Sequence, residues 1–314
     1  MTLFRPLAIA IFALSPAFAT AQNYPTKPVT MMVNFPPGGA TDLAGRALGA
    51  ALGPLLGQPI IIENKGGAGG AIGVGAVAAS PVDGYHAGFV AVAALTTLPQ
   101  MRKVPYRIDS LDYVCQAFDA PVFMLVTQAS RFKTARDLVT FAKAHPGDVN
   151  YATVGPGSLP HMAALDFAKK AGITLTHIPF QGEAPAVTNL LGGHVDLYFG
   201  TNAVASTHKL RRLGVAAAVR VKESQSTPTL GEQGWPVNWS VMGGVIAPAG
   251  MDAQARDALE KACKSAVDAP GFRNALANLN LNRAYASGAE FKSRVLSEAG
   301  KNRVMLRDAG LLAE

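Results

Sequence analysis

Short apolar strands alternate with amphipathic helices along most of this chain, and the alternation restricts the possible folds more than any other feature. A first strand is expected at 29–33, followed by a helix over 43–55 whose apolar residues recur at helical spacing. A strand at 150–153 and a helix at 159–170 repeat that order. Strand–helix alternation is typical of parallel sheets covered by helices. The sequence therefore predicts an α/β protein, and 314 residues are enough for about two domains.

The N-terminal segment resembles a secretory signal peptide. Arg5 precedes an apolar run over 7–14, and Ala19-Thr20-Ala21 offers small residues at the expected cleavage positions. We therefore expect export to the periplasm, with cleavage after Ala21. A spanning helix needs about 20 apolar residues, so this run is too short to cross a membrane comfortably. Cleavage would remove Arg5 and lower the formal charge from +7 to +6.

Three predicted strand-to-helix junctions combine glycine with proline: 35–42, 153–161 and 178–186. Glycine lets a ligand approach the backbone closely, and proline early in a helix occupies a position whose N–H has no helical partner. The remaining free N–H groups and the helix dipole favour anions. Ordinary helix capping also explains any single junction. Three together, in an exported chain with few catalytic residues, indicate a site for a small carboxylate.

The same segments carry a family resemblance that extends over about 24–312. Its strongest segments are Phe35-Pro36-Pro37-Gly38-Gly39-Ala40-Thr41-Asp42, Glu63 through Gly73, Tyr151 through His161, and Pro179 through Ala186. In this order and spacing they resemble the Bug-type extracytoplasmic solute receptors of tripartite tricarboxylate transporters. The resemblance implies a two-lobed periplasmic binding protein of the type II, Venus flytrap kind, each lobe a mainly parallel sheet flanked by helices.

The resemblance also implies how the chain is divided and what it binds. The expected parts are a signal peptide at 1–21, lobe 1 at 22–122, lobe 2 at 123–241, and a return to lobe 1 with C-terminal helices at 242–314. Such a receptor would hold a di- or tricarboxylate, an amino acid or an aromatic carboxylate between its lobes and deliver it to a membrane permease. We expect a monomer that needs no cofactor or metal.

Carried over by position, the resemblance assigns a set of ligand-binding residues. They are Phe35, Gly38, Gly39, Ala40, Thr41, Asp42 and Thr96 from lobe 1, and Gly157, Ser158, His161, Gly182, Glu183, Ala184 and Pro185 from lobe 2. Pro37 has no N–H, so donation from the first loop would start at Gly38.

Glu183 departs from the pattern, because a small neutral residue is expected there. If Glu183 faces the cleft, it would repel a second carboxylate or pair with a ligand amine or protonated ring nitrogen. Alternatively, it is a solvated acid in the first turn of a helix, where it favours the helix dipole.

The two cysteines leave a further question open. Cys115 lies in a strand-like run and Cys263 in a helix-like stretch. In an oxidising compartment they could pair only with Cα atoms within about 7 Å. Nothing in the sequence brings them together, so buried free thiols are the expectation.

Other functions are less well supported. The glycines at 67–73 do not have the spacing of a dinucleotide-binding loop, and Ser158 lacks the G-x-S-x-G context of a hydrolase. The six histidines show no metal-ligand spacing, and the short basic cluster at 209–212 has no interleaved aromatics, which argues against nucleic acid. The expected protein is a transport receptor rather than an enzyme. An extracytoplasmic sensor for a two-component system is the alternative, and an exported hydrolase is the third hypothesis.

Overall fold

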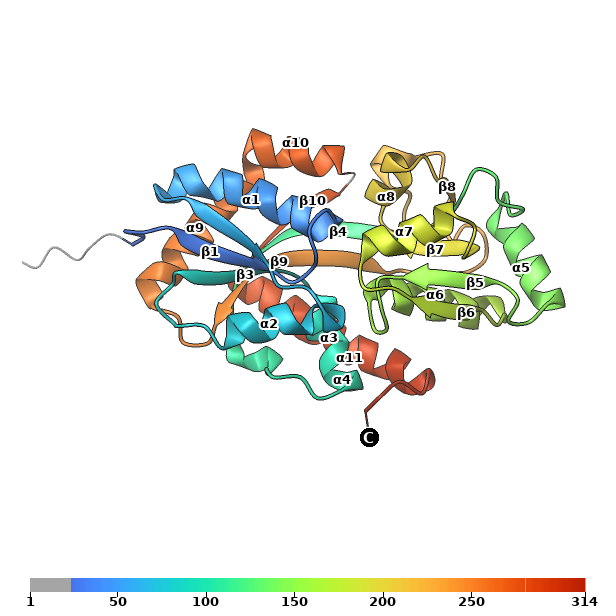
Figure 1. Cartoon of the computed structure of the whole chain (residues 1–314), viewed down its shortest axis with the longest axis horizontal. Helices are drawn as coiled ribbons and strands as arrows, with labels where there is room; N and C mark the ends of the chain where they lie inside the picture. The colour runs from blue at the N-terminus through green and yellow to red at the C-terminus, as the bar shows by residue number, and fades with distance from the viewer. Residues whose placement is uncertain (1–23, 280, 314) are drawn as a thin grey trace, which may run out of the picture.

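The computed structural model describes residues 24–279 and 281–313. The expected signal peptide and its cleavage site therefore lie outside the described residues. Two groups of elements lie side by side and are joined by long strands (Figure 1). None of the helices in the described part of the chain is both long enough and apolar enough to cross a membrane.

The first lobe contains three parallel strands in the order β2-β1-β3. Val29 pairs with Ile60 at one end of this ladder, and Val33 with Phe89 at the other. The elements are β1 (Val29–Val33), α1 (Ala40–Leu56), β2 (Ile60–Asn64), α2 (Ala71–Ala78), β3 (His86–Ala91), α3 (Ala93–Thr96) and α4 (Leu98–Met101). Each strand leads into a helix, as the alternation predicted. Helix α1 lies close to the sheet at Gly45. A Cβ at this position would be only 3.0 Å from side-chain atoms of Val33 and Phe89, so the glycine leaves room for the close packing.

The second lobe repeats the plan with parallel strands in the order β7-β5-β6. Its elements are α5 (Ala135–Ala144), β5 (Asn150–Thr153), α6 (Leu159–Ala171), β6 (Thr176–Pro179), α7 (Glu183–Leu191), β7 (Leu197–Gly200), α8 (Asn202–Thr207) and β8 (Arg211–Ala216). Its apolar core packs around Phe167 and Phe199, whose ring centroids are 6.3 Å apart.

Two long antiparallel strands, β4 (Leu111–Val126) and β9 (Ser240–Pro248), connect the lobes. Strand β4 pairs with β9 in the first lobe and with β7 and β8 in the second (Figure 1). The expected lobe boundaries at 122–123 and 241–242 fall within these two strands. Ala120 pairs with Val241 there, so the two crossing points are hydrogen-bonded neighbours. Closure of one lobe on the other must therefore bend or twist one paired ribbon.

The C-terminal part covers the first lobe with α9 (Ala253–Asp268), α10 (Pro270–Asn278), β10 (Asn282–Ser287) and α11 (Gly288–Asp308). C-terminal helices were expected in this part of the chain, but strand β10 was not. The end of α11 reaches the second lobe, where Lys169 Nζ lies 2.9 Å from an Asp308 carboxylate oxygen. The α/β, two-lobed fold is thus confirmed, and antiparallel strands from β4 and β9 complete each parallel set.

The expectation of free thiols is wrong. Cys115 on β4 and Cys263 on α9 form a disulfide, with Cα atoms 6.5 Å apart. Helix α9 packs on the face of β4 that carries Cys115, and both residues lie in the core of the first lobe. The pairing depends on how a helix nearly 150 residues later docks on the sheet, which local sequence patterns do not reveal.

Candidate functional site

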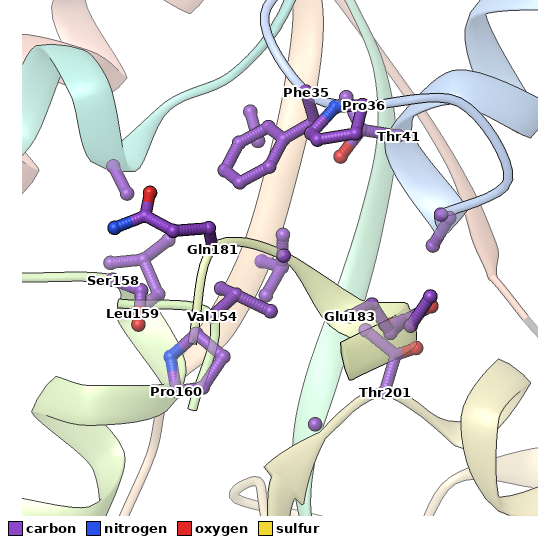
Figure 2. Close-up of a pocket in the computed structure, with 18 of the residues that line it drawn as sticks. Phe35, Pro36, Thr41, Val154, Ser158, Leu159, Pro160, Gln181, Glu183 and Thr201 are labelled. Carbon is purple, nitrogen blue, oxygen red and sulfur yellow. The ribbon is translucent and has the colours of Figure 1, made fainter. Parts of the chain in front are cut away.

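A cavity of about 90 Å³ lies between the two lobes. Figure 2 shows Phe35, Pro36 and Thr41 on one side, and Val154, Gln181 and Glu183 on the other. Its full lining is Phe35, Pro36, Pro37, Gly39, Ala40, Thr41, Ala91, Ala93, Val154, Ser158, Leu159, Pro160, Gln181, Gly182, Glu183, Ala184, Pro185, Tyr198, Gly200, Thr201 and Val241. A water needs roughly 10–15 Å³ by this measure, so the space holds several water-sized groups. The lobes in this arrangement can enclose only a small molecule.

Three long helices begin at the cavity wall: α1 from the first lobe, and α6 and α7 from the second. Gly39 and Gly182 precede α1 and α7, and neither provides a side-chain cap. Ser158 precedes α6, and its hydroxyl accepts a hydrogen bond from His161 N–H at 3.3 Å. Exposed N–H groups at helix starts carry partial positive charge. This charge faces the cavity from both lobes.

Nine of the predicted ligand-binding residues line the cavity. They are Phe35, Gly39, Ala40, Thr41, Ser158, Gly182, Glu183, Ala184 and Pro185. The structure brings them together although the first of the three junctions lies more than 100 residues before the other two. Gly38, Asp42, Thr96, Gly157 and His161 are not among the lining residues.

Asp42 supports the first loop from behind. Its carboxylate accepts hydrogen bonds from Gly38 N–H at 2.9 Å, from Asn64 Nδ2 at 2.8 Å and from Arg46 Nε at 3.1 Å. Burial alone would raise the pKa of Asp42, but these hydrogen bonds outweigh it and hold the pKa below its ordinary value. Asp42 therefore stays ionised, and it fixes the backbone that presents Gly39 and Ala40 to the cavity.

Gly157 and His161 shape the second loop. Gly157 has φ +73°, and its N–H donates to His161 Nδ1 at 3.0 Å. Its carbonyl accepts a hydrogen bond from the Thr97 hydroxyl of the first lobe. Burial, with the neighbouring His177, lowers the pKa of His161 to about 3. The imidazole is neutral at physiological pH and acts as a hydrogen-bond acceptor within the loop.

Thr96 lies on the other side of the connecting strands. Its hydroxyl donates to Val92 O at 3.1 Å, and it lines a second cavity of about 380 Å³ between α6 and α11. Successive strand residues point to opposite faces. Val241 accordingly lines the first cavity, whereas Ser240 and Met242 line the second.

Glu183 faces the cavity and is not a solvated surface acid. Its carboxyl group lies near Ala40 N–H on the opposite lobe and near the Tyr198 hydroxyl on its own lobe. Burial raises the pKa of Glu183 to about 7, and these two donor groups partly oppose that rise. The described residues that line the cavity include no lysine, arginine or histidine. Glu183 therefore brings a carboxyl group that titrates near neutral pH into the cavity, with no cationic side chain among the described lining residues.

The sequence reasoning missed a fourth junction, at the end of β7. Tyr198, Gly200 and Thr201 line the cavity there. Thr201 is 4% exposed, and its hydroxyl has no hydrogen-bond partner in the described part of the chain. A buried polar group normally has a partner, so this hydroxyl is available to a ligand or water. The strand-like run at 195–199 and Gly200 after it form only part of the signal at the other junctions, because no proline follows.

Two α/β lobes joined by paired long strands, with a cavity between them, define a two-lobed solute-binding receptor. Comparison with known proteins gives the family: the chain matches the tripartite tricarboxylate transporter family receptor over residues 45–311, and it belongs to that family. Among the described residues, no group of three or more His, Cys, Asp or Glu is placed to hold a metal ion. Because the family consists of receptors, the prediction that the chain is not an enzyme is confirmed.

Individual relatives agree with this assignment. Protein BugT of Bordetella pertussis is 30% identical, and the alignment covers 99% of each chain. An R. palustris structure with adipate is 25% identical with a TM-score of 0.87, covering 92% of this chain and 99% of that one. MatC of Rhodopseudomonas palustris with bound malate is 27% identical with a TM-score of 0.81, covering 90% and 100%. The Bug-type resemblance is therefore confirmed.

Proposed function

We propose that this protein is a periplasmic receptor that captures a small organic carboxylate between its lobes. The observation that carries the proposal is the convergence of helix starts on a cavity whose described lining has no Lys, Arg or His. Fixed backbone dipoles attract an anion without the cost of desolvating a cationic side chain. Two similar proteins, with adipate and with malate bound, support the carboxylate class.

Binding between the two lobes explains how a ligand changes the conformation of the receptor. A ligand shifts the open–closed balance only by its differential affinity for the two states. Ala40 and Thr41 on the first lobe and Gly182 to Pro185 on the second can contact one molecule at once only when the lobes are closed. The ribbon formed by β4 and β9 is the hinge in this proposal, with lobes at 22–122 and 123–241 and a return at 242–314. Gly38, Asp42, Gly157 and His161 support the proposed site from behind the cavity wall.

Delivery of the ligand to a tripartite tricarboxylate permease, by a monomer exported with cleavage after Ala21, completes the proposal. The family assignment supports the permease as partner. Deletion of the gene should abolish uptake of the ligand while the permease subunits are still made. A changed transcriptional response with unchanged uptake would instead support the sensor alternative.

A thermal-shift screen of purified protein against small carboxylates tests the binding step. A ligand stabilises by an amount that grows with its concentration relative to Kd. We expect a concentration-dependent rise in melting temperature with at least one carboxylate. No shift across mono-, di- and tricarboxylates and amino acids would contradict the proposal.

A further inference from the structure

The cavity carries its own carboxyl group at one end. Glu183 stands at the first position of α7, and a Cβ at Gly39, the residue before α1 on the other lobe, would lie 4.0 Å from the Glu183 Cβ. The Ala40 N–H and the Tyr198 hydroxyl both lie near the Glu183 carboxyl group. The start of α1 therefore already faces a carboxyl group of the protein itself, which is an anion once it ionises. A ligand carboxylate placed there would have to displace Glu183 or lie beside it.

A second carboxylate in this place would be poorly tolerated. Like charges that share a water-poor site repel strongly, because the effective dielectric constant is well below that of water. The described lining residues offer no cationic side chain that would offset the repulsion. Among the described residues that line the cavity, only Tyr198 and Glu183 have side chains that titrate, and burial raises the pKa of Tyr198 well above its ordinary value. The Tyr198 hydroxyl thus stays protonated and able to donate a hydrogen bond.

A hydrogen-bond donor on the ligand would find acceptors in the same place. The Thr201 hydroxyl is buried and unpartnered among the described residues, and it lines the wall that also carries Glu183 (Figure 2). A carboxylate oxygen has room for more than one hydrogen bond. Glu183 and Thr201 together therefore form an end of the cavity that accepts hydrogen bonds. Gln181 and Ser158, which can donate, lie at the other end in the same view.

We propose that Glu183 determines ligand specificity, and that the receptor takes a carboxylate bearing a protonated amine in preference to a dicarboxylate of the same length. The ligand amine binds Glu183 and Thr201, and its carboxylate lies toward Gln181 and Ser158. This inference rests on the proposed carboxylate-receptor function and names the ligand class for that site.

Matched ligand pairs test the proposal. Titration calorimetry at pH 8, where Glu183 is largely ionised, compares adipate with 6-aminohexanoate and succinate with 4-aminobutanoate. In at least one pair, we expect the amino compound to bind the wild type at least tenfold more tightly than the dicarboxylate.

The variant Glu183→Gln keeps the side-chain shape and a carbonyl that can still accept from Ala40 N–H. It should lower affinity for the amino compound at least tenfold and raise affinity for the dicarboxylate. The control Glu223→Gln removes the same charge at an exposed position outside the cavity and should leave the preference unchanged.

Three results would overturn the inference in distinguishable ways. Tighter dicarboxylate binding by the wild type would overturn it, as would a preference that Glu183→Gln leaves unchanged. In both cases the carboxylate-receptor function would stand. If no member of either pair, and no other small carboxylate, binds the folded wild type or the folded variant, the proposed function fails as well.

Discussion

The carboxyl group of Glu183 should make the stability of the protein depend on pH in a way that one substitution removes. Glu183 faces the Ala40 N–H from α1 and the Tyr198 hydroxyl from β7. Its pKa is about 7 in the folded state against an ordinary value of 4.5. The folded protein then binds a proton that the unfolded chain has released, between pH 4.5 and 7. Stability must fall as pH rises through this window, because the native state binds more protons there.

The size of the effect follows from the two pKa values. A difference of one pKa unit corresponds to about 1.36 kcal/mol. The shift from 4.5 to about 7 therefore predicts a loss of about 3 kcal/mol in the free energy of unfolding between pH 4 and pH 8. Glu183→Gln has no proton to exchange at this site. The difference between wild type and variant should change by that amount across the range.

Urea denaturation of both proteins at half-unit pH steps measures the difference directly. Burial lowers the pKa of His161 to about 3 and of His177 to about 4, so these groups raise stability with rising pH. Both proteins retain them, so their contribution cancels in the comparison. Glu223→Gln serves as the control and should stay parallel to wild type. A wild-type-minus-variant difference that is constant from pH 4 to 8 would refute the assignment of a buried, proton-binding carboxyl group.

Three further substitutions probe the cavity and the core. Gly39→Leu would project a side chain into the cavity, since a Cβ at Gly39 would lie 4.0 Å from the Glu183 Cβ. Calorimetry should show that this variant loses carboxylate binding. The control Gly300→Leu, which adds its side chain in open space on α11, should still bind the carboxylate. Thr201→Val should leave the urea midpoint unchanged or higher, because the buried hydroxyl has no partner among the described residues, yet weaken ligand binding severalfold; equal affinity would exclude the hydroxyl from the site. Replacement of Cys115 and Cys263 by alanine should lower the free energy of unfolding by about 2–5 kcal/mol with ligand affinity retained, and an unchanged urea midpoint would contradict a stabilising disulfide.

The sequence allowed most of the local structure to be predicted. Helix α1 was expected from apolar spacing, and α6 from the repeated strand–helix order. Gly57 and Gly172 end these helices in the left-handed conformation. Strand β4 was only partly anticipated, because its 16 residues cross from one lobe to the other. Its length is set by pairing with β9, β7 and β8 in turn. Such pairing is a property of the whole fold.

The candidate site was likewise predictable from local sequence only in part. The glycine–proline pattern marked the junctions that contain Ala40 and Gly182, and the family resemblance assigned these residues to the site. Thr96 and Gly157 were not separated from them, because whether a residue faces the cavity depends on how the lobes meet. The Thr97–Gly157 contact joins residues 60 positions apart and turns the second loop toward the first lobe. The Cys115–Cys263 disulfide likewise depends on helix docking.

Capture of a small carboxylate between the lobes is most directly tested by titration calorimetry with a panel of small carboxylates on the wild type and on Gly39→Leu. The account predicts saturable binding of at least one carboxylate to the wild type and its loss in Gly39→Leu, with Gly300→Leu as the folded control. Absence of binding to the wild type, or equal affinity in Gly39→Leu, would contradict it.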